Sequence, residues 1–79
     1  MIPLPERIHQ IVTGHTGIKA SRLCAQLATE YLNLTGKEIR MTLITMIANK
    51  EVVEIEYTLP NGKNDAIILE KGSEFKGVN

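Results

Sequence analysis

The sequence predicts a single small α+β domain, in which three helices pack on a small antiparallel sheet with a two-stranded hairpin. Three observations predict this class. Three successive segments carry apolar residues at helical spacing, the third opens with a capping pattern at Thr35, and polar and apolar residues then alternate around a turn at Pro60. A chain of 79 residues has room for one domain with a modest core, which we expect over about residues 5–70.

The first helix is expected over about residues 5–13. Pro5 suits the first helical position, because the amide hydrogen that proline lacks would have no partner there. One apolar stripe of this helix consists of Leu4, Ile8, Ile11 and Val12. Gly14 and Gly17 end the helix. Residues 18–20 then form a short extended segment, which provides a third strand.

A second helix is expected to follow Ser21, which is a favourable N-cap residue, and to run to about residue 31. The side that faces the core comprises Leu23, Cys24, Leu27, Ala28 and Tyr31. The small side chains of Ala25 and Ala28 allow a neighbouring helix to approach closely.

The third helix has the clearest start. Thr35 and Glu38 have the spacing of a capping box, in which each side chain accepts a hydrogen bond from the other residue's amide. The helix is expected to end near Asn49 or Lys50. Its buried stripe comprises Ile39, Leu43, Met46 and Ile47. The opposite side comprises Lys37, Met41, Thr42, Thr45 and Ala48, with Arg40 at its flank.

Alternation after residue 50 predicts two antiparallel strands joined by a turn at residues 59–62. Pro60 presets the backbone of this turn, and Gly62 takes the left-handed position of a bulge. If Leu59 faces Lys63, the cross-strand pairs are Val53 with Leu69, Ile55 with Ile67 and Tyr57 with Asp65. We expect this set to pack on the helices. The residues expected on the solvent face are Glu54, Glu56, Ile68 and Glu70.

Beyond Gly72 we expect a loosely held tail with Phe75 as its one anchor. Nine Lys and Arg residues balance nine Asp and Glu residues, so the net charge does not indicate a polyanionic partner. The single Cys24 excludes an intramolecular disulfide and fits a reducing compartment. The apolar runs are far shorter than the roughly 20 residues of a membrane helix, and the N-terminus lacks the features of a signal peptide. We therefore expect a cytoplasmic protein with no membrane partner.

No residues indicate a catalytic, metal or cofactor site. His9 and His15 have a spacing that fits neither one face of a helix nor a familiar ligand motif, and no carboxylate cluster joins them. Cys24 lies on an apolar stripe and is expected to be a core residue. Gly14 and Gly17 lack the strand-before-helix context of a phosphate-binding loop. The sequence does not predict an enzyme.

The element order, the helix starts at Ser21 and Thr35 and the hairpin tip at residues 60–62 resemble the winged helix-turn-helix family over about residues 5–70. The resemblance implies a DNA-binding protein, such as a small transcription regulator that acts as a homodimer, with the third helix in the major groove. The chain is also similar to small uncharacterised proteins, often of phage or mobile-element origin. The segments that carry this second resemblance are Gly17-Ile18-Lys19, Val53-Glu54-Ile55-Glu56-Tyr57, Leu59-Pro60 and Lys71-Gly72.

The winged-helix resemblance implies a set of DNA contacts. The residues are Lys19, Arg22, Thr35, Lys37, Arg40, Thr42, Thr45 and Lys63. Thr35 lies at a helix N-terminus, whose amides suit a phosphate. Arg40 is the candidate for base recognition, because a guanidinium can form two hydrogen bonds with guanine.

Two alternative functions follow from the hairpin. Glu54, Glu56 and Glu70 would repel a DNA backbone, and they predict instead a protein-interaction module, such as a phage-type modulator or assembly subunit, that docks on a basic partner surface. The exposed edge of the hairpin can also pair with a second copy of the chain, which would make dimerisation the main role.

Overall fold

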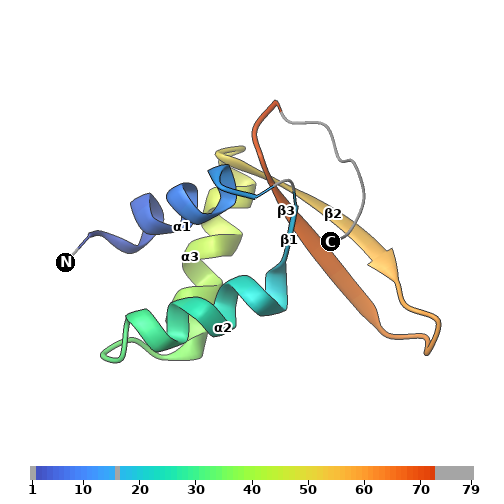
Figure 1. The fold of residues 1–79 in the computed structure, drawn as a ribbon, viewed down its shortest axis with the longest axis horizontal. Coiled ribbons are helices and arrows are strands. Elements are labelled where there is room, and N and C mark those ends of the chain that lie inside the picture. The colour runs from blue at the N-terminus through green and yellow to red at the C-terminus, as the bar shows by residue number, and fades with distance from the viewer. Residues whose placement is uncertain (1, 16, 73–79) are drawn as a thin grey trace.

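A computed structural model describes residues 2–15 and 17–72 of the chain. These residues form three helices and a three-stranded antiparallel sheet, so the fold is α+β. The elements are α1 (Leu4–Thr13), β1 (Ile18–Lys19), α2 (Ala20–Glu30), α3 (Gly36–Ala48), β2 (Val52–Thr58) and β3 (Asn64–Glu70). The helices lie on one side of the sheet, and the β2–β3 hairpin extends beyond them (Figure 1). The predicted anchor Phe75 lies outside the described residues.

The first helix is confirmed, whereas two details of the second are wrong. α2 begins at Ala20, not after Ser21, and no side chain caps its start. The reason is that β1 pairs with β3 through Lys19, so the chain turns into the helix directly after this residue. Ala25 and Ala28 are exposed, because the buried side of α2 is centred on Leu23 and Leu27.

The predicted capping box at the start of α3 is confirmed. The Glu38 amide donates to the Thr35 hydroxyl oxygen at 3.1 Å, and the Thr35 amide donates to the Glu38 carboxylate at 2.8 Å. Further along α3, Ile39, Leu43 and Met46 are buried, as their helical spacing predicts.

The hairpin register is also confirmed. Val53 pairs with Leu69 and Tyr57 with Asp65, as the turn chemistry predicts. The Leu59 amide donates to the Lys63 carbonyl oxygen at 2.7 Å and closes the loop. Gly62 has a φ of 84°, a left-handed conformation that glycine adopts at no steric cost.

The predicted assignment of the sheet faces is wrong. Ile18, Val52 and Ile68 belong to the core that the helices cover. Residues paired across antiparallel strands point to the same face, so Glu54, which pairs with Ile68, lies on the helix side of the sheet. The residues that the sequence analysis assigned to the core, Val53, Ile55, Tyr57, Ile67 and Leu69, form the outer face.

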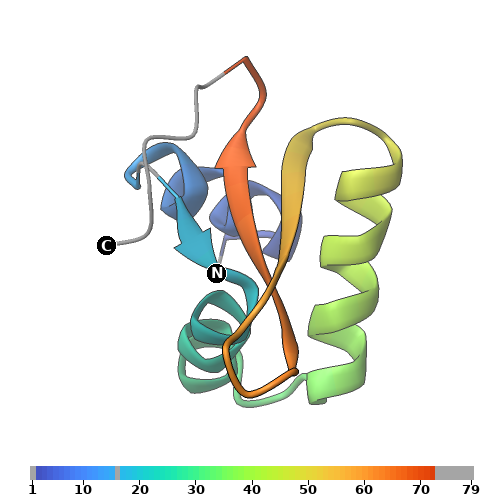
Figure 2. The same cartoon turned by 90° about the vertical axis from the view of Figure 1, so that its right-hand side faces the viewer.

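The strand order explains this error. β3 lies between β1 and β2, so the sheet has one strand more than the hairpin alone (Figure 2). Ile67, Ile68 and Leu69 are all buried, with at most 1% of each side chain exposed. A central strand that is buried on both faces has a continuous apolar run, and such a run does not indicate which face is which.

Candidate functional site

The first turn of α3 is the predicted phosphate site. Here the Glu38 carboxylate already binds the Thr35 amide, so the capping box brings a negative charge to the positive end of the helix. The amides of Gly36 and Lys37 follow in the first turn, where helix geometry provides no carbonyl acceptor. An anion at this end would therefore bind these two amides beside the exposed Lys37 side chain.

The solvent side of α3 carries the other predicted helix contacts. Arg40 and Thr45 are exposed, and Thr42 is partly buried. The Thr42 hydroxyl donates to the Glu38 carbonyl oxygen at 3.0 Å, and the Thr45 hydroxyl donates to that of Met41 at 2.9 Å. Both threonines therefore offer an outside partner only an acceptor oxygen.

Two apolar side chains are exposed on the same helix. Met41 is 52% exposed and Ile44 is 48% exposed. The predicted solvent side of this helix includes Met41 but not Ile44. Its position three residues after Met41 could have identified it, because residues at this spacing are neighbours on a helix surface.

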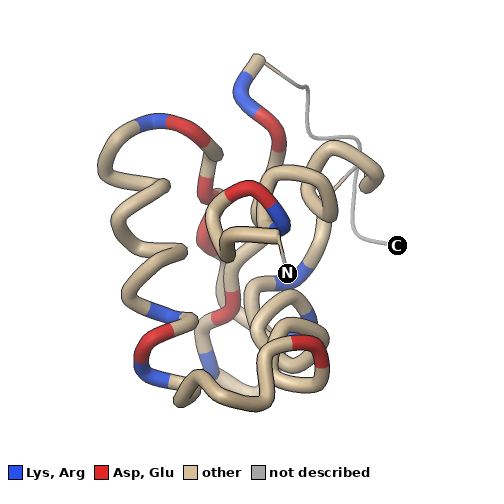
Figure 3. The backbone as a smooth tube through the Cα atoms, turned by 90° about the vertical axis from the view of Figure 1, so that its left-hand side faces the viewer, with Lys and Arg blue, Asp and Glu red and all other residues tan. Residues whose placement is uncertain are grey.

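The remaining predicted cations do not form one patch with Lys37. The hairpin tip, which carries Lys63, and the start of α3 both lie at the lower edge of the molecule in Figures 1 and 2, but Figure 1 shows them on opposite sides along the longest axis. Lys19, however, pairs with Ile67 on the outer face of the sheet. Arg22 is exposed on α2. Basic and acidic segments are interspersed along the chain (Figure 3).

A hollow of about 480 Å³ lies between α2, α3 and β2. Its apolar lining includes Leu43, Ile44 and Ile47, and its charged lining consists of Arg40 and Glu54. Cys24 also lines it. Burial raises the pKa of the Cys24 thiol, against a smaller opposite effect of the Arg40 charge. This thiol is therefore a poor nucleophile at neutral pH.

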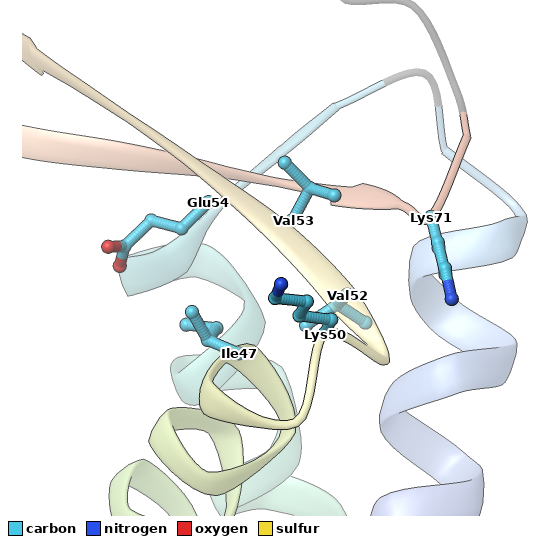
Figure 4. Close-up of a pocket in the computed structure, with 6 residues that line it drawn as sticks. All are labelled: Ile47, Lys50, Val52, Val53, Glu54 and Lys71. Carbon is cyan, nitrogen blue, oxygen red and sulfur yellow. The ribbon is translucent and has the colours of Figure 1, made fainter.

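A second hollow, of about 370 Å³, adjoins the first and shares Ile47 and Glu54 with it. Glu54 and Lys71 stand on opposite sides of it (Figure 4). The pKa of Glu54 is raised, mainly by burial and further by the negative charge of Glu56. Within residues 2–15 and 17–72, the one ion pair joins Arg7 to Glu30, so neither Lys71 nor Arg40 neutralises Glu54.

The histidines have structural surroundings. His15 Nδ1 lies 2.6 Å from the carbonyl oxygen of Ile11, one turn back in the chain, and His9 is exposed on α1. In the described part of the chain, no three His, Cys, Asp or Glu side chains gather in a way that could hold a metal ion.

No protein-family model, curated protein or solved structure matches this chain. None of the helices within the described residues is long and apolar enough to cross a membrane. The functional assignment therefore depends on the geometry of this chain.

Proposed function

We propose that this protein binds double-stranded DNA as a winged helix-turn-helix domain, with α3 in the major groove. The order of elements, the sheet order β1-β3-β2 and the projecting hairpin are compatible with this family. The start of α3 and the hairpin tip lie along the same lower edge of the molecule, on opposite sides of it in Figure 1, so a duplex that reaches both must run along this edge.

One observation carries the proposal. Lys37 and Arg40 are exposed one turn apart on α3, while Glu38, the only carboxylate of this helix, is bound in the capping box. This part of α3 is therefore locally basic although the whole chain is neutral. Lys63 adds a cation at the hairpin tip. Arg40 reads a base, and Lys37 and Lys63 bind phosphates.

The test is the salt dependence of binding to short duplexes, followed by fluorescence anisotropy. The two phosphate contacts from Lys37 and Lys63 predict a slope of log affinity against log salt of about −2, and phosphate contacts from Lys19 and Arg22 as well would predict about −4. Lys37→Ala and Arg40→Ala weaken binding, whereas Lys19→Ala, on the outer face of the sheet, leaves it unchanged. The proposal fails if the protein does not bind DNA at low salt, or if its affinity does not depend on salt.

A second candidate function is binding to a basic protein surface through Glu54, Glu56 and Glu70. The observation in its favour is that Glu54 and Glu56 are both exposed and close enough for the charge of Glu56 to raise the pKa of Glu54. Changing all three residues to lysine would abolish partner capture from cell extract while the circular dichroism spectrum stays unchanged. Equal capture by this variant would exclude the acidic surface.

A further inference from the structure

The hollow between α2, α3 and β2 carries opposite charges on its two sides. Arg40 comes from the N-terminal half of α3, and Glu54 comes from β2. Glu54 also lines the adjoining hollow with Ile47, close to the C-terminal end of α3. The positive group therefore lies towards the start of α3 and the negative group towards its end, and the two are not paired with each other.

The surface between these charges is apolar. Ile44 lies one helical turn after Arg40 and is 48% exposed, and Leu43 and Ile47 line the hollow beside it. Exposing a large apolar side chain such as that of Ile44 to water is unfavourable. The chain has no net charge, so two copies do not repel each other.

We propose that the self-association surface formed by Arg40, Ile44, Ile47 and Glu54 binds a second copy of the chain across a two-fold axis. With the axis at Ile44, the two α3 helices run antiparallel. The Arg40 end of each helix then lies against the Ile47 and Glu54 end of the other. A two-fold interface requires such a self-complementary patch. If Arg40 of the first copy contacts Glu54 of the second, then Glu54 of the first copy also contacts Arg40 of the second.

In this dimer two Arg40–Glu54 pairs form between the copies, one on each side of the axis. Ile44 of each copy enters the apolar hollow of the other. Arg40 also belongs to the proposed DNA surface, so self-association and DNA binding compete for this side chain. The dimer is measured without DNA, and its failure would leave the proposed DNA binding untouched.

The experiment is a charge exchange, followed by sedimentation equilibrium of the full chain at low salt. Wild-type protein is expected to show a monomer–dimer equilibrium. Arg40→Glu alone, or Glu54→Arg alone, raises the dissociation constant at least about tenfold, because each creates two like-charge contacts. The double variant Arg40→Glu/Glu54→Arg restores dimerisation. Arg22→Glu removes an exposed cation outside the hollow and leaves the dissociation constant unchanged.

Three results would overturn the proposal: a wild-type monomer at concentrations up to about 1 mM, single variants that dimerise normally, or a double variant that stays monomeric although it is folded. If a variant does not fold, the proposal is tested on the wild-type protein instead, by recording its amide shifts at a series of protein concentrations. The amide shifts of residues 40–47 and of Glu54 are expected to change with concentration. Concentration-dependent shifts at other positions alone would contradict the surface.

Discussion

Arg7 and Glu30 join α1 to α2 through an ion pair with two hydrogen bonds. Arg7 Nε lies 2.7 Å from Glu30 Oε1, and Arg7 Nη2 lies 3.1 Å from Oε2. Gln26 donates a further hydrogen bond to Oε2 at 3.1 Å. These bonds lower the pKa of Glu30, with Arg7 as the main cause, and raise that of Arg7. The pair therefore links α1 to α2 at the partly exposed surface of the molecule.

The first prediction concerns the pH dependence of this pair. Because the folded state lowers the pKa of Glu30, the carboxylate stabilises the fold above its ordinary value of 4.5, and this stability is lost as the pH falls through the lowered pKa. Glu30→Gln should therefore lower the melting temperature at pH 7 but not at strongly acidic pH. In an Arg7→Met background the same change should have less effect. A difference that does not vary with pH would contradict this assignment.

The second prediction concerns the end of α3. Lys50 has a left-handed backbone with a φ of 60°. Its amide donates to the Ile47 carbonyl oxygen, and the Glu51 amide donates to that of Met46, so the helix ends in a Schellman motif with lysine at the usual glycine position. Lys50→Gly should stabilise the protein by about 1 kcal/mol in urea unfolding. Asn49→Gly serves as the control, because Asn49 has a φ of −83° and should give no gain.

The third prediction concerns Ser21 and Thr35, each of which the sequence predicts to cap the start of a helix. Thr35 caps α3 in the structure, and Ser21 caps nothing because α2 begins before it. Thr35→Ala should cost about 1 kcal/mol of unfolding free energy. Ser21→Ala should stay within about 0.5 kcal/mol of wild type. Equal losses in the two variants would show that α2 begins after Ser21.

The fourth prediction tests which face of the sheet packs on the helices. Ile68 is fully buried in the helix-covered core, and Val53, on the outer face, is 40% exposed. Ile68→Ala should therefore cost about 2–5 kcal/mol of unfolding free energy. Val53→Ala should cost less than about 1 kcal/mol, because much of this side chain already contacts water. If Val53→Ala costs more unfolding free energy than Ile68→Ala, the face that carries Val53 packs on the helices, as the alternation of polar and apolar residues predicts.

The parts of the fold that local chemistry determines could be predicted from the sequence. The Thr35–Glu38 box defined the start of α3, and the turn around Pro60 and Gly62 fixed the hairpin register. The faces of the sheet could not be predicted in this way. They depend on the pairing of Ile18 with Ile68, which are 50 positions apart and whose contact no local pattern indicates.

The candidate site shows the same division. The helical spacing identified Lys37 and Arg40 as exposed. The hollow beside Arg40 could not be predicted, because Cys24, Ile44 and Glu54 come from three different elements that only tertiary packing brings together. The separation of Lys19 from α3 likewise depends on β1 being an edge strand of the sheet.

The most direct test of the central proposal is an amide-shift titration of the protein with a short DNA duplex at low and at moderate salt. DNA binding through α3 and the hairpin tip predicts that residues 35–45 and 61–63 shift first, and that the shifts weaken as salt rises. If no residue shifts at low salt, or if the shifts are confined to the strand around Glu54 and Glu56, the DNA-binding proposal is wrong.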